Sequence, residues 1–168
     1  SVLGVNLGMF YKRRDYSRVV DGRNPIIAHE YLGSDVAGKD AFISDDIISS
    51  GESMLDIAYN LKARNAKRIF TYATYAIFTN GLASFDKAYQ EGFIDGVFGS
   101  NLTYLSEELK NRPWFYEVDV SKYIAYFISA LNHDMSISAL IDSHKKIDTL
   151  LEKRKEERSK YQDTQLSF

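Results

Sequence analysis

The sequence contains no cysteine, which excludes disulfide bonds and thiolate metal sites. No apolar run approaches the roughly 20 residues that a membrane-spanning helix needs. Neither sign of charge is in excess, because 21 basic residues stand against 23 acidic ones, for a net charge of −2. This balance gives no indication of nucleic acid or an anionic membrane as a partner. The first residues are too few and too uncharged for a secretory signal, so we expect a soluble, cytoplasmic protein.

The length of 168 residues fits one domain, and a hydrophobic content of 45% is enough for a sizeable core. We expect this domain to span residues 1–150, followed by a charged helical tail over residues 151–168. The chain opens on Ser1 with an apolar, strand-like segment, whereas chains usually enter a domain through polar residues. This start indicates a piece of a longer polypeptide.

The order of sequence patterns predicts an α/β fold. Short apolar or β-branched segments predict strands over residues 2–7, 26–31, 41–44, 68–74, 94–98 and 114–118. Helical spacing of apolar residues predicts a helix after Gly51 and a helix over residues 82–91. It also predicts a helix capped by Asp119 or Ser121 and a last helix capped by Ser136. The polar residues 11–18 predict an exposed loop, and residues 19–24 a turn or hairpin tip. Because strands and helices alternate from residue 41 onward, the central sheet is expected to be mostly parallel.

The segment from Ala41 to Ser53 carries the strongest functional signal. A predicted strand runs into two neighbouring carboxylates, Asp45 and Asp46, and then into a turn of small residues before a helix begins. Backbone N–H groups of such a turn and helix start can bind an anion. The carboxylates can accept hydrogen bonds from hydroxyl groups or hold a hard cation. This order of parts fits a phosphorylated sugar, and an aspartate cap before an ordinary turn is the alternative.

Four further candidates have weaker signals. The basic run Lys12–Arg14 fits either a functional loop or a solvated surface. His144 lies near the apolar face of the last predicted helix and is expected to pack there. His133 is expected to cap the helix before it, and His29 could approach the site.

Residues 42–53 resemble the phosphoribosyl-diphosphate motif of the type I phosphoribosyltransferases. The resemblance extends to one branch of that superfamily, the ribose-phosphate diphosphokinases, also called phosphoribosyl-pyrophosphate synthetases. Further similar segments are Lys12–Arg14, Gly38–Asp40, Ala66–Phe70 with Ala73–Thr74, and Phe78–Gly81. The likeness covers most of residues 3–145 and corresponds to the C-terminal half of such a synthetase. It implies the three-layer type I phosphoribosyltransferase-like fold with a mostly parallel central sheet.

The resemblance also implies an activity. Family members transfer the diphosphate of ATP to the C1 hydroxyl of ribose 5-phosphate, giving phosphoribosyl diphosphate and AMP, and they require Mg²⁺. The resemblance implies that the chain binds the 5-phosphate through Ser49, Ser50, Gly51, Glu52 and Ser53. Asp45 would bind ribose hydroxyls, with Asp46 supporting it or the metal, and Asp45 and Asp46 are the expected metal ligands. Lys12 and Arg14 match the catalytic residues that stabilise charge on the transferring diphosphate, with Arg13 between them pointing elsewhere.

The chain departs from the family pattern at several positions. The family usually has Thr where Ser50 and Ser53 stand, Asp where Ser49 stands and a small residue where Glu52 stands. The stretch from Lys12 to Asp45 is also longer than in the common bacterial enzyme. Much of the family's ATP site comes from the N-terminal half and from a neighbouring subunit. We therefore expect an incomplete ATP site, weak or no activity for this chain alone, and a homo-oligomer.

Two other functions remain open at this stage. A phosphoribosyltransferase that joins phosphoribosyl diphosphate to a base would need a base-binding hood and its own flexible loop, and neither is evident. A non-catalytic or regulatory domain would bind sugar phosphates without turnover.

Overall fold

The computed structural model describes residues 3–14, 26–142 and 144–165, without the side chains of residues 12–14, 26–30, 139 and 158–165. The chain divides into two compact units. One unit is Asn6–Ser121, and the other contains the chain from Lys122 onward together with the N-terminal residues up to Val5. The candidate site lies in Asn6–Ser121.

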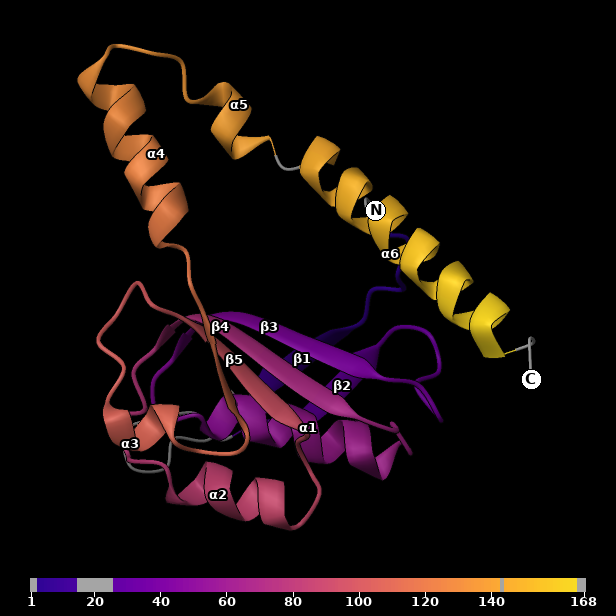
Figure 1. Ribbon diagram of the computed structural model, residues 1–168. Coiled ribbons are helices and arrows are strands. Elements are labelled where there is room, and N and C mark those ends of the chain that lie inside the picture. Colours follow the sequence, from indigo (N-terminus) through magenta and orange to yellow (C-terminus); the bar gives the residue numbers. More distant parts are fainter. Residues whose placement is uncertain (1–2, 15–25, 143, 166–168) are drawn as a thin grey trace. The chain divides into compact units, whose positions relative to one another are not determined.

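A four-stranded parallel sheet is the centre of Asn6–Ser121 (Figure 1). Its strands stand in sequence order: β3 (Ala41–Ile48), β4 (Ile69–Ala76), β5 (Gly96–Ser100) and β6 (Phe115–Val118). The connecting helices are α1 (Glu52–Ala63), α2 (Ala83–Gln90) and α3 (Glu107–Lys110). Because parallel connections are right-handed, strands added in sequence order place all their helices on the same face of the sheet. Figure 1 shows α1 and α2 on one side of the strands, and the predicted α/β class and parallel sheet are confirmed.

The hydrophobic core lies between this face and the helices. Val97 of β5, Phe85 of α2 and Trp114 before β6 are all fully buried. The rings of Phe85 and Trp114 stack with centroids 5.7 Å apart, and Phe78 meets Phe85 edge-on at 5.0 Å. Each buried aromatic or aliphatic side chain of this kind stabilises the fold by about 1.5–3 kcal/mol. This cluster fixes the loops at the carboxyl ends of β3 and β4.

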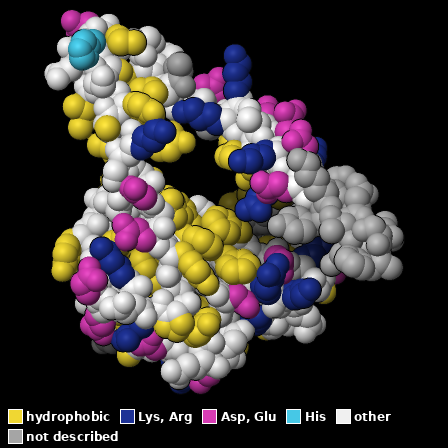
Figure 2. All heavy atoms as spheres, in the orientation of Figure 1, with side chains coloured by type: hydrophobic (Ala, Val, Ile, Leu, Met, Phe, Trp, Pro, Cys, Tyr) yellow, Lys and Arg dark blue, Asp and Glu magenta, His cyan; other side chains and the backbone are white. Residues whose placement is uncertain are grey.

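The opposite face of the sheet carries a row of aromatic side chains, one from each strand. Phe98 lies 6.4 Å from Phe42, 6.3 Å from Phe70 and 5.1 Å from Tyr116, as measured between ring centroids. Phe42 is 63% exposed and Tyr116 is 47% exposed. Hydrophobic side chains are visible at the surface above the sheet in Figure 2. Within Asn6–Ser121, the described helices therefore supply one layer against the sheet, on the face opposite this row.

A separate two-stranded antiparallel sheet precedes β3. It pairs β1 (Met9–Arg14) with β2 (Ile26–Leu32). The strand predicted for residues 26–31 is confirmed. The strand predicted for residues 2–7 is wrong within the described residues, because residues 3–8 form no strand and β1 begins at Met9. The loop predicted from residue 11 is wrong up to Arg14. Both strands of a two-stranded ribbon are edges that can expose backbone groups and side chains to solvent, so polar residues are tolerated in it. Residues 19–24, predicted as a turn or hairpin tip, lie outside the described residues.

The structure also differs from the predicted elements at three other places. The strand predicted to end at Ser44 continues to Ile48, and α3 was not predicted. In the other unit, α4 (Ser121–Asn132) is as expected, but two helices, α5 (Ser138–Ile141) and α6 (His144–Gln165), replace the single last helix. The carboxylate of Asp142 accepts the His144 backbone N–H at 3.1 Å and thereby starts a new helix. Among the helices described, none has the length and apolar character needed to span a membrane.

Candidate functional site

The turn between β3 and α1 is exposed at its surface and fixed underneath. Ser49 is exposed, Ser50 is half-buried and Gly51 is buried. Gly51 has a φ of 80°, a left-handed conformation that favours glycine. A Cβ atom at this position would lie 2.2 Å from a ring carbon of Phe85. Both the backbone conformation and the packing therefore require glycine at residue 51.

The loop after β4 holds this turn in place through its backbone. The N–H groups of Ile77 and Phe78 donate to the Ile48 carbonyl at 3.0 and 3.1 Å, and the Thr79 N–H donates to the Ser49 carbonyl at 3.0 Å. The hydroxyl oxygens of Ser49 and Thr79 lie 3.4 Å apart. These bonds leave the Ser49 side chain on the outside of a rigid backbone.

Helix α1 begins directly after the turn. No side-chain hydrogen bond caps its N-terminus at Gly51, and the Glu52 N–H reaches the Ser50 hydroxyl only at 3.4 Å. The side chains of Glu52 and Ser53 are exposed. The start of this 12-residue helix carries a partial positive charge of roughly half a unit. Its first turn can therefore contribute to binding an anion at the exposed turn.

Asp45 and Asp46 lie within the last part of β3, both with exposed side chains. They had been predicted to follow the strand, but pairing with β4 continues through Ile48. One oxygen of Asp45 accepts the Asp46 N–H at 2.9 Å. Ile43 and Ile48 are both buried although they are an odd number of residues apart, so the two-residue alternation of the strand is broken between them. The Asp pair lies at this irregularity, beside the turn.

The two carboxylates fit the donor chemistry of Mg²⁺, which prefers oxygen ligands. Within the described part of the chain, no group of three or more His, Cys, Asp or Glu residues could hold a metal ion. Mg²⁺ is commonly held by one or two carboxylates, with water and substrate phosphates completing its ligands. The pair Asp45 and Asp46 fits this arrangement.

The basic candidates lie in a different element from the turn. Lys12 and Arg14 belong to β1, where they are paired with His29 and Ile26 of β2, and the register shifts between Arg13 and Arg14. Their side chains lie outside the described part of the structure. The structure thus brings Asp45, Asp46 and the turn together at one end of the parallel sheet, whereas the roles expected for Lys12 and Arg14 stay predictions.

The histidine predictions have mixed outcomes. His133 follows the predicted helix, with its Nδ1 atom 2.8 Å from the Ser129 carbonyl oxygen. His144 was predicted to pack against an apolar face, which is wrong: its side chain is 69% exposed, and its Nδ1 atom lies 2.8 Å from Asp142. The hydrogen bonds from His144 lower the pKa of the Asp142 carboxyl group. The side chain of His29 lies outside the description.

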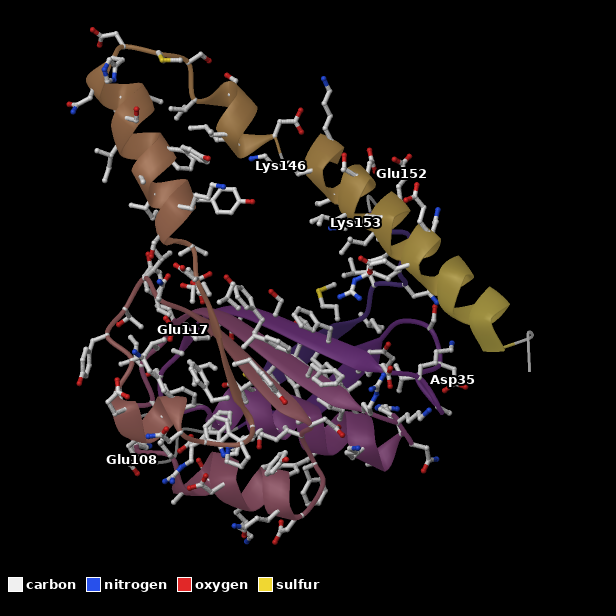
Figure 3. All side chains as sticks on the ribbon, viewed as in Figure 1. Asp35, Glu108, Glu117, Lys146, Glu152 and Lys153 are labelled. Atoms are coloured by element: carbon white, nitrogen blue, oxygen red, sulfur yellow. The ribbon has the colours of Figure 1, made fainter. Side chains whose placement is uncertain are left out.

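A pocket beside the turn was not anticipated. It has a volume of about 210 Å³ and is lined by the loop after β4 and the segment around α3: Ala76, Ile77, Phe78, Gly81, Leu82, Tyr104, Ser106, Glu108 and Leu109. Glu108 projects from α3 (Figure 3), and Tyr104 is 85% exposed. The sequence offered a signal for one wall only, the Asn80-Gly81 turn. The loop shared with the candidate turn places the pocket at the carboxyl edge of the sheet, where parallel sheets bind ligands.

Comparison of the whole sequence with models of known protein families gives a match. The model of the phosphoribosyl synthetase-associated domain matches residues 21–142. The chain belongs to this family. The family resemblance proposed from the sequence is confirmed at this level.

Curated relatives agree with the assignment to the phosphoribosyl synthetase-associated family. The ribose-phosphate pyrophosphokinase of Vibrio cholerae serotype O1 is 30% identical over 138 residues, which cover 82% of this chain and 41% of the relative. The enzyme of the same name from Haemophilus influenzae is 32% identical over 127 residues, 74% of this chain and 39% of the relative. The chain thus spans about two fifths of the length of these relatives.

A solved structure supports the fold. The phosphoribosylpyrophosphate synthetase of Mycobacterium smegmatis is similar with a TM-score of 0.56 and 22% sequence identity, over 64% of this chain and 34% of that chain. At this identity the similarity shows the fold alone.

Proposed function

We propose that this chain supplies the ribose 5-phosphate site of a ribose-phosphate diphosphokinase. In that reaction the C1 hydroxyl oxygen of ribose 5-phosphate attacks the β-phosphorus of ATP. The bond between this phosphorus and the oxygen bridging to the α-phosphate breaks, AMP leaves, and the hydroxyl proton is released. One observation carries the proposal: an exposed small-residue turn precedes α1, and two exposed carboxylates precede the turn.

The sugar 5-phosphate would bind at the turn, to Ser49–Ser53. The rigid backbone and the start of α1 supply N–H groups and a favourable dipole without reorganisation on binding. The serine hydroxyls can donate further hydrogen bonds to phosphate oxygens. Binding at the turn would need no change in its backbone conformation, because hydrogen bonds from the loop after β4 already fix that conformation.

Asp45 would accept hydrogen bonds from the ribose hydroxyls, and Asp46 would support it or hold the metal ion. One oxygen of Asp45 accepts the Asp46 N–H, which orients the carboxylate. Mg²⁺, when bound, would neutralise charge on the phosphate oxygens. Asp45 and Asp46 would act by holding the sugar and the ion in position, which is the main requirement of phosphoryl-type transfer.

Lys12 and Arg14 would stabilise negative charge on the transferring diphosphate, as the family resemblance implies. Cations that approach the reacting groups only during the reaction lower its barrier more than they improve substrate binding. We expect substitution of either residue to reduce kcat far more than it weakens ribose 5-phosphate binding.

We propose further that the chain corresponds to the C-terminal half of the synthetase, with an incomplete ATP site. The basis of this correspondence is the order of the family-like segments along the chain: first Lys12–Arg14, then Gly38–Asp40, then residues 42–53. The isolated chain would then bind ribose 5-phosphate but turn over ATP weakly or not at all, and the complete enzyme would assemble as a homo-oligomer.

A non-catalytic sugar-phosphate-binding domain is the second candidate. The observation that favours it is the exposed carboxylate of Glu52 in the first turn of α1, next to the turn that would hold the phosphate. An assay of AMP release from ATP and ribose 5-phosphate separates the two, performed on this chain alone and on this chain joined to the remainder of a synthetase. Turnover by the joined protein supports the enzyme, and binding without turnover in both supports the binding domain.

Calorimetry with ribose 5-phosphate and Mg²⁺ tests the site itself. We expect Asp45→Ala to weaken binding by roughly 10- to 100-fold, the loss expected for charge-assisted hydrogen bonds worth about 1.5–3 kcal/mol. Asp56→Ala is a matched control, because it removes an exposed carboxylate from α1 one turn beyond the proposed site. No heat from the unsubstituted chain, or equal losses in both variants, would contradict the proposed site.

A further inference from the structure

The pocket between the loop after β4 and the segment around α3 has no role in the proposed ribose 5-phosphate site. Its deepest lining is apolar, because Ala76, Phe78 and Leu109 are all buried. Its volume of about 210 Å³ is below the roughly 300–1,000 Å³ of pockets that hold a drug-sized ligand. The size of the pocket therefore suits a single ring system better than a complete nucleotide.

The wall formed by the loop after β4 has its shape before any ligand binds. Phe78 has a φ of 51°, an unusual conformation for a bulky residue, and Gly81 has a φ of 77°. The Gly81 N–H donates to the Phe78 carbonyl at 2.9 Å. The Phe78 ring is held in the core, with its centroid 5.0 Å from that of Phe85 and 5.9 Å from that of Trp114. A ligand that enters the pocket does not have to order this wall, which favours binding.

Two side chains give the pocket an acceptor and a donor. The Ser106 hydroxyl accepts the Leu109 N–H at 3.2 Å, which leaves its own proton for a ligand. One oxygen of Glu108 pairs with the Arg112 guanidinium at 2.9 Å, which leaves the other oxygen able to accept. Among the described residues, no Lys, Arg or His lines the pocket. The lining thus favours a neutral ligand with its own donor and acceptor over a phosphate or a carboxylate.

An aromatic side chain stands at the rim of the pocket. Tyr104 lines it and is 85% exposed, and its side chain has no hydrogen bond or ring contact within the described part of the chain. Ile77, on the loop after β4, is also half exposed and lines the same pocket. An exposed tyrosine ring can stack on the face of a flat ligand. The rim therefore has an aromatic face that no described residue covers.

We propose that this pocket binds a planar heteroaromatic ring with an amino group beside a ring nitrogen, as in the nucleobase adenine. The amino group would donate to the free Glu108 oxygen, and the ring nitrogen would accept the Ser106 hydroxyl proton. Tyr104 would stack on one face of the ring. This inference goes beyond the proposed function, because the pocket uses neither the turn of residues 49–53 nor Mg²⁺.

The test is a titration of the full chain with adenine, without sugar phosphate or metal, followed through its backbone amide resonances. We expect saturable shifts at residues 77–82 and 104–109. Purine, which has the same rings without the amino group, should bind more weakly by roughly three- to tenfold, the loss of one hydrogen bond. Adenosine and AMP distinguish the two sources of such a ring. Affinities equal to that of adenine indicate the base of a nucleotide, and weaker binding of both indicates the free base; each result requires the ring pocket.

Neighbouring glutamates provide a matched pair of variants. Glu108→Ala should weaken adenine binding by roughly three- to tenfold, whereas Arg112 keeps its ion pair with Asp86 and the fold is retained. Glu107→Ala removes an exposed carboxylate that does not line the pocket, and it should leave the affinity unchanged. Purine lacks the group that Glu108 would bind, so its affinity should be equal for Glu108→Ala and the unsubstituted chain.

Tyr104 tests the stacking contact. Tyr104→Ala should weaken adenine binding by roughly fivefold or more without lowering the thermal midpoint, because this side chain is exposed and has no described contact. Tyr104→Phe keeps the aromatic face and should restore the affinity. A purely structural role would instead lower the midpoint of Tyr104→Ala.

Three results would overturn the inference: no saturable shift at residues 77–82 or 104–109, purine binding as tightly as adenine, or equal losses in Glu107→Ala and Glu108→Ala. None of them affects the proposed ribose 5-phosphate site, since these titrations contain no sugar phosphate. Failure of ribose 5-phosphate to bind at the turn would equally leave the ring pocket in place.

Discussion

The starts of α1 and α2 have the same place in the fold but different side chains. Each helix follows a neighbouring strand of one parallel sheet, and each has an acidic residue in its first turn. In α2 that acid is Asp86, which accepts the Trp114 indole N–H at 2.8 Å and lies 3.1 Å from the Arg112 guanidinium. In α1 it is Glu52, which is exposed beside a serine turn. The same topology thus gives two helix starts, of which one has its acidic residue bonded to the core and the other has its acidic residue exposed.

The largest expected difference between the two helix starts is the loss of stability when the glycine before each helix is replaced by alanine. Gly51 and Gly81 have φ values of 80° and 77°, but only a Cβ at Gly51 would collide with Phe85, while the space at Gly81 is open. A left-handed alanine costs about 1–2 kcal/mol, and overpacking adds about 1–3 kcal/mol. We expect Gly51→Ala to lose about 2–5 kcal/mol in urea unfolding followed by circular dichroism, and Gly81→Ala about 1–2 kcal/mol. Equal losses would show that the turn before α1 is not held by Phe85.

Replacing the two first-turn acids should separate their roles. Asp86→Ala leaves the fully buried Trp114 indole N–H without its acceptor, which costs about 1–3 kcal/mol. Glu52→Ala removes only an interaction with the helix dipole, worth about 0.3–1 kcal/mol. Chemical denaturation of both variants measures the difference. A loss for Glu52→Ala as large as that for Asp86→Ala would contradict the view that Glu52 is free of a structural role.

The candidate sugar-phosphate motif could be predicted from the sequence because its parts are adjacent in the chain. Asp45, Asp46 and Ser49–Ser53 lie side by side whatever the rest of the fold does, and the helical spacing after Gly51 fixed where α1 begins. The exact end of β3 was not visible, because Asp45 and Asp46 are poor strand residues that pairing with β4 nevertheless includes. Tertiary pairing overrode local preference at that point.

Contacts between segments that are distant in the chain could not be predicted from the sequence. The collision that forbids a side chain at Gly51 involves Phe85, and the bonds that fix the turn come from Ile77, Phe78 and Thr79. The pocket wall around Tyr104 has no motif of its own. β1 was misread because its polar residues resemble a loop, whereas a two-stranded ribbon tolerates polar side chains on both faces.

The smallest expected effect concerns the serine hydroxyl of the turn. The hydroxyls of Ser49 and Thr79 are 3.4 Å apart, and the backbone bonds already fix the turn. Ser49→Ala and Thr79→Ala should each change stability by less than about 0.5 kcal/mol. Calorimetry with ribose 5-phosphate and Mg²⁺ should show weaker binding for Ser49→Ala by roughly threefold or more, the loss of one hydrogen bond, and no change for Thr79→Ala. Weaker binding in both, to the same degree, would place the ligand between the two loops rather than on the turn.

The most direct test of the site is a map of backbone amide resonances during titration with ribose 5-phosphate and Mg²⁺. Our account predicts that the amides of residues 49–53 shift in a saturable manner, while those at the start of α2, residues 82–85, shift much less. Saturable shifts at residues 82–85 with none at residues 49–53 would contradict it, as would no saturable shift in either segment.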